Sequence, residues 1–377
     1  MTSIPRMSLA RGSNDTSAML DLTRWTAAQA VCVGHSLSFF GIVDALRPPN
    51  SPSMQSLAVI VFFVLSGFLI AHALQRRPRQ IGHGFGEYMI DRTSRIYIAF
   101  VPCLLIIALI DLCLIGAGLH PNAAYVTPQA FLGSLLMMQN YPGAFGASLE
   151  IPSFGSAGQL WSLAVEFHIY VFAGACFFAL RPTKWWAACV AVAIVSSVVP
   201  LNYLNPAVIG TPGASLSWLW ILGFAIYYIA RGTQLLTAVG IGAAYAGALA
   251  LGSAWYRSSP PGAEYEPRAY FILAVAFLLL ILASQRTTLL ARSSRLTRCL
   301  RVLADYSFSL YLLHYTILFA IHAIWDGGGV LAALIGIALS NIFAFVVAQF
   351  TECRHKELAG WIKQKLYPIP VTNSPPR

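Results

Sequence analysis

The sequence predicts an all-α, polytopic membrane protein with about ten transmembrane helices and both termini in the cytoplasm. Three observations predict this fold class. Hydrophobic residues make up 57% of the 377 residues and charged residues only 10%, whereas soluble domains carry roughly 25% charged residues. About ten apolar runs reach the length of roughly 20 residues that a helix needs to cross a bilayer. Basic residues gather in every second connection between these runs, as the positive-inside rule requires.

The apolar runs follow one another along most of the chain. The segment 129–140 is apolar but too short to cross, so we expect it to be interfacial or re-entrant. The fifth and the last run have the weakest pattern. The expected spans are residues 25–45, 56–75, 95–117, 158–180, 185–201, 214–231, 235–254, 269–285, 305–324 and 329–350.

The basic residues orient these spans. When the N-terminus is placed inside, 21 of the 24 Lys and Arg residues fall on the inner side, and only Arg47, Arg257 and Arg268 fall outside. An odd number of spans would scramble this split, so the pattern favours ten spans with both ends inside. Topology and contact with anionic lipid then explain the formal net charge of +10, and no nucleic-acid partner is expected.

The membrane region is expected to form one domain, residues 21–352, between cytoplasmic tails at 1–20 and 353–377. The N-terminal tail lacks the basic-then-apolar pattern of a cleaved signal peptide. The residues from Tyr367 onward hold four prolines and are expected to be disordered. The seven cysteines contain no CxxC pair, so neither a disulfide framework nor a zinc or other metal site is expected.

A few ionisable side chains lie inside the predicted spans, where a charge costs about 2.5–3.5 kcal/mol on insertion scales. His35 lies eleven residues beyond Arg24, which is about 16 Å along a helix and close to three full turns, so both are expected on one face. Glu166 and His314, on two other spans, are expected at a similar depth near the midplane. The other ionisable side chains inside the predicted spans are Asp111, His72, His168 and His322. The three histidines among them are expected to be hydrogen-bonded packing residues.

Arg92 and Arg95 form an RxxR pair where the third span begins, and their i, i+3 spacing turns them to the same side of the helix. Guanidinium groups bind phosphate through two parallel hydrogen bonds. The pair therefore indicates an anionic ligand, with ordinary positive-inside anchoring as the alternative. Ser66 and Gly67 make a small-residue step in the second span, which allows close helix packing or the passage of a thin ligand.

Five short motifs, each weak alone, occur in one order along the chain and together resemble the acyltransferase-3 family of membrane O-acyltransferases. Two positions depart from the family pattern, because Leu22 stands in place of the glycine of LDGxR and Phe167 in place of a second acidic residue. About 27 residues follow the last span, so no C-terminal esterase-like domain is expected. The motifs are Arg24 to His35 (R-x10-H), Phe62 to Ile70 (FFxLSGFLI), Arg92 to Arg95 (RxxR), Trp161 to Glu166 (WSLxxE) with Tyr170 beyond it, and Asp305 to His314 (SYxxYLLH).

The resemblance implies an O-acetyltransferase of the bacterial inner membrane that moves an acyl group from acyl-coenzyme A, the co-substrate, to a hydroxyl of a carbohydrate. It implies no permanently bound cofactor. The chemistry also suits the residues, because a hydroxyl needs a base to attack a thioester and histidine titrates nearest neutral pH. His35 is the expected general base, and Glu166 is expected to orient it or to stabilise its charged form.

The remaining site residues divide between the two substrates. Arg24, Arg92 and Arg95 are expected to hold the phosphates of the coenzyme, and the pantetheine arm is expected to pass Ser66 and Gly67. The acceptor, a surface polysaccharide or lipid-linked glycan, is expected to meet the residues Trp161, Ser162, Tyr311 and His314.

Two alternatives stay open. Cys32 lies one turn before His35 and is a candidate nucleophile, although direct transfer needs no covalent step. A proton-coupled transporter or exporter of a small molecule or lipid-linked sugar also uses intramembrane His and Glu, but the two halves of the chain show no hydropathy repeat. The sequence does not distinguish the acyl chain, the acceptor hydroxyl, the side from which the acceptor enters, or the oligomeric state.

Overall fold

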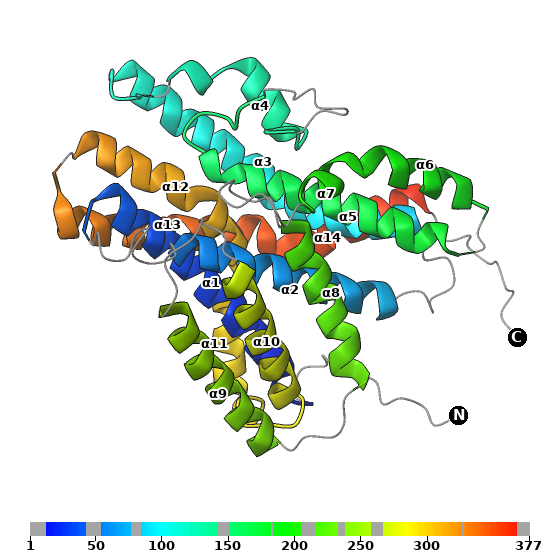
Figure 1. Ribbon diagram of the computed structural model, residues 1–377. Coiled ribbons are helices and arrows are strands. Elements are labelled where there is room, and N and C mark those ends of the chain that lie inside the picture. The colour runs from blue at the N-terminus through cyan, green and yellow to red at the C-terminus, as the bar shows by residue number, and fades with distance from the viewer. Residues whose placement is uncertain are drawn as a thin grey trace, which may run out of the picture.

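The computed structural model describes residues 13–42, 54–76, 84–121, 123–141, 151–181, 184–204, 216–232, 238–257, 267–325 and 327–367, and within them it contains helices and no strand (Figure 1). Over the residues that the structure describes, each apolar run of the sequence coincides with a helix; residues 43–45, 214–215 and 235–237 of these runs lie outside the described residues. These helices are α1 (Thr16–Phe39), α2 (Met54–Arg76), α3 (Phe85–Gly116), α5 (Trp161–Ala179), α6 (Trp186–Ser196) with α7 (Val198–Asn202), α8 (Leu216–Gly232), α9 (Ala238–Arg257), α10 (Pro267–Ser284), α12 (Ser307–Ile324) and α13 (Gly329–Phe350).

Shorter helices occupy the connections. α4 (Pro128–Leu135) forms in the apolar segment that is too short to span, and it begins where the Thr127 side chain accepts a hydrogen bond from Ala130 N at 3.1 Å. Four further short helices were not predicted as separate elements. They are η2 (Ala123–Tyr125), η4 (Gly158–Leu160), α11 (Ser294–Asp305) and η5 (Glu352–Arg354).

Two predicted boundaries change because helices extend beyond the apolar residues. α1 begins at Thr16, inside the predicted N-terminal tail, and α3 begins at Phe85, ten residues before the apolar run. The predicted C-terminal tail is also partly structured, since α14 (His355–Leu366) follows η5. Lys363 of α14 binds Asp91 of α3 with an Nζ–Oδ1 distance of 2.6 Å, so α14 packs on the first turns of α3.

Five helical segments of the described chain are long and apolar enough to cross a membrane: Met54–Gln75, Phe85–Gly116, Gly158–Ala179, Ser307–Ile324 and Gly329–Leu366. Four shorter apolar helices occur at Trp186–Ser196, Leu216–Arg231, Gly240–Ala250 and Ile272–Ser284. α1 is not among the five, and it carries both Asp21 and Arg24 in its first half.

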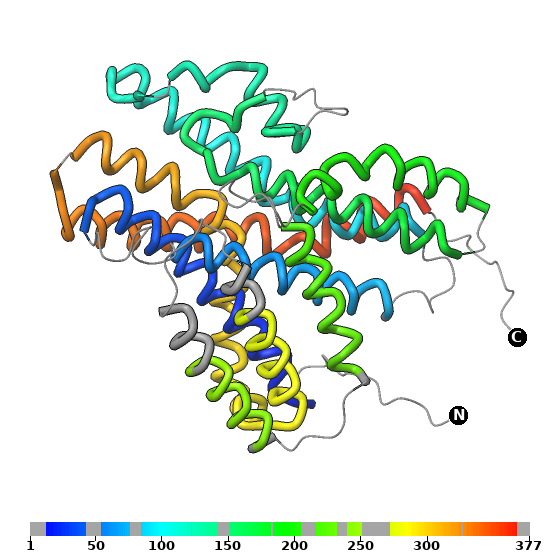
Figure 2. Tube along the Cα trace, viewed as in Figure 1, coloured from blue at the N-terminus to red at the C-terminus, as the bar shows by residue number. Residues whose placement is uncertain are grey.

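α1 lies at the centre of the bundle. Figure 2 shows α1, in blue, beside α12 and α13, in orange, although almost 300 residues separate them in the chain. α1 also packs against α2. α2 in turn packs closely along α8. At that contact a Cβ added to Gly67 would lie 2.0 Å from the Trp220 carbonyl oxygen, and one added to Gly223 would lie 1.9 Å from the Val64 carbonyl oxygen. The two glycines therefore allow the backbones of α2 and α8 to touch.

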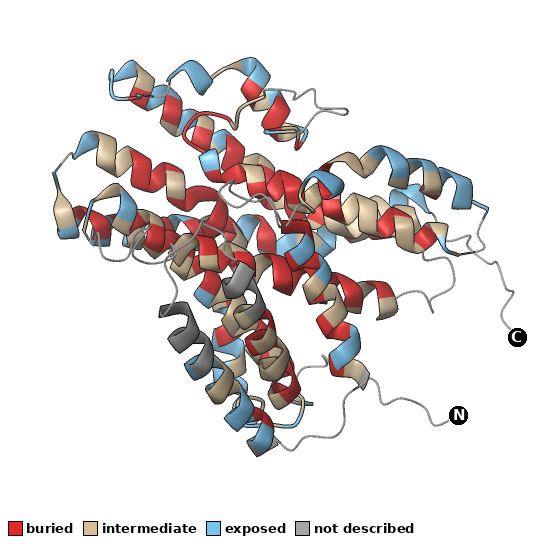
Figure 3. Ribbon diagram, viewed as in Figure 1, coloured by how far each residue is buried: buried red, intermediate tan, exposed pale blue. Residues whose placement is uncertain are grey.

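Burial follows this arrangement. Buried residues gather where the central helices meet, whereas the outer sides of α6, α9 and α13 are exposed (Figure 3). Large apolar side chains on α13, such as Val330 and Leu334, are 58% exposed, as expected for a surface in contact with lipid tails rather than water.

For orientation, we call the two ends of the bundle the α14 end, where α3 begins, and the α4 end, where α3 finishes.

Candidate active site

α1, α2, α3, α5 and α12 surround two adjoining cavities at the centre of the bundle. The first, which we call the arginine cavity, has a volume of about 300 Å³. It is lined by Arg24, Val59, Phe62, Phe63, Leu65, Ser66, Leu69, Ile70, Ala73, Arg92, Arg95, Ile96, Ser162, Leu163, Glu166, Tyr170, Phe308 and Tyr311. The second, which we call the histidine cavity, has a volume of about 280 Å³. It is lined by Val31, His35, Gln55, Ser56, Val59, Gly158, Gln159, Trp161, Ser162, Tyr311 and Tyr315.

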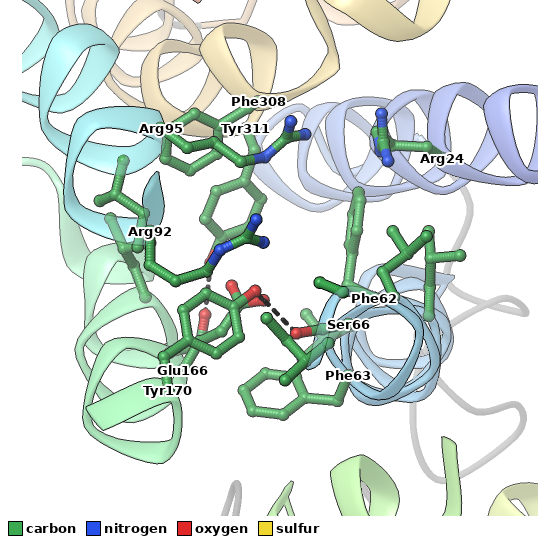
Figure 4. A pocket seen from close by; sticks show the side chains of 18 residues that line it. Arg24, Phe62, Phe63, Ser66, Arg92, Arg95, Glu166, Tyr170, Phe308 and Tyr311 are labelled. Atoms are coloured by element: carbon green, nitrogen blue, oxygen red, sulfur yellow. Dashed lines mark hydrogen bonds between the residues drawn. The ribbon is translucent and has the colours of Figure 1, made fainter. Parts of the chain in front are cut away.

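Three half-buried arginines line the arginine cavity. Arg92 and Arg95 stand three residues apart on α3, and Arg24 comes from α1, across the cavity (Figure 4). No described carboxylate forms an ion pair with any of the three guanidinium groups, and Arg92 Nε is buried without a hydrogen-bond partner. One carboxylate, Glu166, lines the same cavity, so the three guanidinium groups leave an excess of positive charge, and like charges that share a cavity repel one another unless further anions join them. The arrangement therefore suits a ligand that carries several negative charges, such as a set of phosphates.

One face of α5 forms the opposite wall of the arginine cavity. Ser162, Glu166 and Tyr170 follow one another at four-residue intervals, so they lie on the same side of the helix. The Tyr170 hydroxyl donates a hydrogen bond to Glu166 Oε1 and lies 2.8 Å from Ser66 Oγ on α2. Because the tyrosine proton points to the carboxylate, Ser66 is the donor in the second bond. Figure 4 shows this chain of three groups running from α2 to α5.

Ser66 and Gly67 have different surroundings. Ser66 lines the arginine cavity, whereas the Cα of Gly67 faces the backbone of α8, where any side chain would collide. Gly67 does not line the cavity, and the structure gives it a role in helix packing. Consecutive residues on a helix point about 100° apart, and at this step Ser66 turns toward the cavity while Gly67 turns toward α8.

His35 lines the histidine cavity from α1. Its ring lies 4.9 Å from the Tyr315 ring and 5.4 Å from the His314 ring, measured between centroids. His314 is fully buried, and its Nδ1 lies 3.0 Å from the Leu310 carbonyl oxygen and 2.9 Å from that of Tyr311. Since carbonyl oxygens only accept, Nδ1 carries the proton. The second nitrogen, Nε2, is buried without a hydrogen-bond partner.

The two cavities share three lining residues, Val59, Ser162 and Tyr311. The Ser162 and Tyr311 hydroxyl oxygens lie 2.5 Å apart, and the Tyr311 hydroxyl also donates to the Gln159 carbonyl oxygen at 2.8 Å. These residues form a thin partition that carries two hydroxyl groups. A group that reaches the partition from the arginine cavity would therefore lie next to the cavity that His35 lines.

The structure does not join Glu166 to His35, contrary to the expectation that they meet. No described hydrogen bond or ion pair links them, and Glu166 binds Tyr170 instead. The reason is the register of α5, since Glu166 lies one turn beyond Ser162, about 6 Å further along the helix and past the partition. Arg24 and His35 were expected on one face of α1. Arg24 lines the arginine cavity, and His35 lines the adjoining histidine cavity.

Three other predicted positions can be placed. Trp161 lines the histidine cavity and its ring stacks near Tyr203, with centroids 6.4 Å apart. His314 does not line either cavity, because it lies behind His35 within the packed helix contacts. Cys32 is completely buried in a cluster with Tyr306, Leu310 and residues of α13, so it faces away from both cavities and is poorly placed to act as a nucleophile.

Sequence reasoning missed several lining residues. Tyr315 of α12 contacts the His35 ring, and Gln55 of α2 lines the same cavity. Gln159, two residues before the WSLxxE motif, also lines this cavity and was not assigned a role. Tyr315 directly follows His314, and Gln55 is the first strongly polar residue of an otherwise apolar helix, which were the available signals. Neither signal shows which way the side chain points, because that depends on how the helices are rotated against each other.

Comparisons with known proteins agree with the motifs. The profile of the acyltransferase-3 family, described as an acyltransferase domain, matches residues 18–349. A protein of Shigella phage Sf6 named O-acetyl transferase is 30% identical over 161 residues, which cover 42% of this chain and 45% of the phage protein. Protein 2 in the picA locus of Rhizobium radiobacter is 33% identical over 101 residues, which cover 27% of this chain and 49% of that protein. The chain spans about half the length of these curated relatives, and no solved structure matches it significantly.

Proposed function

This chain belongs to the acyltransferase-3 family of acyltransferase domains, and on that premise we propose that it is a membrane O-acetyltransferase. It moves an acetyl group from acetyl-coenzyme A to a hydroxyl of a carbohydrate, on a surface polysaccharide or another glycoconjugate. The name of the phage relative supports acetyl as the group transferred. The single observation that carries the proposal is the pair of adjoining cavities, one lined by three arginines and the other by a histidine, which meet at two hydroxyl groups.

The arginine cavity is the donor site in this proposal. Coenzyme A is a polyanion, and guanidinium forks bind phosphate oxygens through paired charge-assisted hydrogen bonds. Arg24, Arg92 and Arg95 would hold those phosphates, and the wall of α2 between Phe62 and Ile70 is apolar enough to line the pantetheine arm. Ser66 on this wall and Tyr170 on the facing wall of α5 would offer hydroxyl groups to the amides of the arm.

The histidine cavity is the acceptor site. His35 accepts the proton of the acceptor hydroxyl while the hydroxyl oxygen bonds to the carbonyl carbon of the thioester. The C–S bond breaks, the coenzyme leaves as its thiolate, and the proton on His35 passes to that sulfur. Ser162 and Tyr311 stand at the point where the carbonyl oxygen becomes negative, so their hydroxyls are suited to stabilise it. Trp161 offers an aromatic face and Gln55 an amide to the sugar.

Glu166 takes a different role from the one expected from the sequence. It binds Tyr170 and lies among the arginines, so it positions the tyrosine on the donor side and balances part of the positive charge there. Its removal should therefore weaken donor use rather than change the basicity of His35. The partner behind His35 is His314, whose protonated Nδ1 fixes its ring against the α12 backbone.

The topology belongs to the proposal as well. We infer ten spans for residues 21–352, both termini in the cytoplasm, and residence in a bacterial inner membrane, because the basic residues alternate in this way along the chain. The α14 end then faces the cytoplasm, where acetyl-coenzyme A is made, and the α4 end faces outward. The donor enters from inside and the acceptor reaches His35 from outside.

The test uses purified full-length protein, labelled acetyl-coenzyme A, and surface glycan isolated from a strain in which the gene is deleted. Wild-type protein should transfer label to the glycan, and His35→Ala should lose transfer by at least about a hundredfold while it binds coenzyme A as before. Normal transfer by His35→Ala would overturn the role of His35. If no label is transferred but a labelled solute shows counterflow across vesicles without acyl-coenzyme A, the protein is a transporter instead.

A further inference from the structure

Asp111 is a carboxylate near the α4 end of α3 that neither cavity uses. Its side chain is completely buried, and a buried carboxylate inside a predicted span is retained only when specific partners satisfy it. Its Oδ2 accepts a hydrogen bond from the backbone N–H of Ser156 at 2.9 Å, and its Oδ1 lies 3.2 Å from His120 Nε2. Both partners belong to the segment that connects α3 to α5, so Asp111 holds two distant points of that connection against the bundle.

The chain passes very close to this carboxylate. Gly155 has a φ of +53°, and a Cβ added there would lie 1.9 Å from Asp111 Oδ2. Only glycine combines that backbone angle with such an approach at no steric cost. Ser156 then donates from its hydroxyl to Thr316 Oγ1 on α12 at 2.8 Å. Residues 155 and 156 are thus fixed on one side by α3 and on the other by α12.

The same segment continues directly into the wall of the histidine cavity. Gly158, Gln159 and Trp161 line that cavity two to six residues after the contact with Asp111. Gln159 Nε2 donates to the Leu312 carbonyl oxygen at 3.1 Å, and the Gln159 carbonyl oxygen accepts from Tyr311. A shift at Ser156 would therefore move the residues that face His35 and one of the hydrogen bonds that holds the partition.

We propose that Asp111 is a positioning residue that holds residues 155–162 in place and thereby shapes the acceptor side of the histidine cavity. The inference rests on the proposed function where it calls that cavity the acceptor site. Asp111 touches neither substrate. It acts through the Ser156 N–H and through the close passage of Gly155. Its loss should therefore affect the acceptor wall and leave the three arginines, which lie beyond the partition, in place.

The experiment measures hydrogen–deuterium exchange of full-length protein in detergent micelles, with coenzyme A binding by calorimetry as a second readout. Asp111→Ala should raise the exchange rate of the peptide that covers residues 155–162 by about tenfold or more, because the local hydrogen bonds open more often. Asp111→Asn should restore most of the protection, since its amide oxygen still accepts from Ser156 N–H. Leu112→Ala is the matched control, because Leu112 is the next residue and is 59% exposed.

Gly155→Ala disturbs the same contact from the side of the connecting segment. It tests the role of Asp111 even if Asp111→Ala does not fold. It should raise exchange over residues 155–162 and reduce transfer of acetyl label to glycan, while the Kd for coenzyme A changes less than about twofold. Unchanged exchange in both variants overturns the proposal, and so does an equal rise in peptides of α1 and α2, which would indicate a general structural role. If the wild-type protein binds no coenzyme A, the proposed function fails while the exchange data still decide the role of Asp111.

Discussion

The arginine cavity and the histidine cavity share three residues and differ in almost everything else. The first carries three guanidinium groups, one carboxylate and long apolar walls. The second carries an imidazole, two glutamine amides and aromatic rings, and none of the described Lys, Arg, Asp or Glu residues lines it. A polyanion suits only the first, and a neutral sugar suits the second. In the proposed reaction, a polyanionic donor and a neutral acceptor would therefore bind side by side in one membrane bundle, with their reacting atoms meeting at the partition.

The largest expected effect comes from removing the charge that distinguishes the donor side. The double variant Arg92→Ala/Arg95→Ala should raise KM for acetyl-coenzyme A by about a hundredfold or more, because each charge-assisted hydrogen bond contributes roughly 1.5–3 kcal/mol. Initial rates at varied donor concentration measure it. Arg295→Ala is the matched control, since Arg295 is an exposed arginine on α11. An equal rise in the KM of the acceptor would mean that the pair supports the fold rather than the donor.

The second effect concerns the partition that the two cavities share. Tyr311→Phe keeps the ring but removes the hydroxyl that contacts Ser162 and Gln159. We expect kcat to fall by about a hundredfold with both KM values nearly unchanged, as for the loss of one group that stabilises a developing oxyanion. Steady-state kinetics with both substrates varied separate the two constants. A fall confined to one KM would place Tyr311 in a single binding site and not at the boundary.

The third effect tests the acceptor side alone. Trp161→Ala should lower kcat/KM for the glycan by about tenfold, because an aromatic contact contributes roughly 0.5–1.5 kcal/mol beyond its buried area. Coenzyme A binding should stay the same, since Trp161 lines only the histidine cavity. Trp185→Ala serves as the control, because Trp185 is 64% exposed. Weaker coenzyme A binding in Trp161→Ala would show that the two cavities do not act separately.

The smallest effect concerns the contact between α14 and the helix that carries the RxxR pair. Lys363→Ala removes the ion pair with Asp91, whose side chains are 27% and 11% exposed. An ion pair this near the surface contributes about 0–1 kcal/mol, so thermal unfolding should shift by only a few degrees and KM for the donor by less than about threefold. Loss of all donor binding would instead show that α14 is needed to hold Arg92 in place.

Much of the site could be predicted because it depends on spacing within single helices. Arg24 and His35 lie on one side of α1, and Arg92 and Arg95 on one side of α3, because helical periodicity relates them directly. The same rule relates Ser162, Glu166 and Tyr170 on α5. The helices themselves could be predicted from apolar runs, except where α1, α3 and α14 contain polar turns that hydropathy does not detect.

By itself, then, the sequence determined the all-helical membrane fold and the pairs of residues that share a helix face, since both follow from local periodicity and from the cost of charge in lipid. The tertiary structure decided which faces meet. It placed Glu166 beyond the partition from His35, turned Gly67 toward α8, put His314 behind the cavity wall, and brought Gln55 and Tyr315 to His35. These outcomes depend on how far each helix is rotated and shifted against its neighbours, and packing between helices sets that, not the spacing along any one of them.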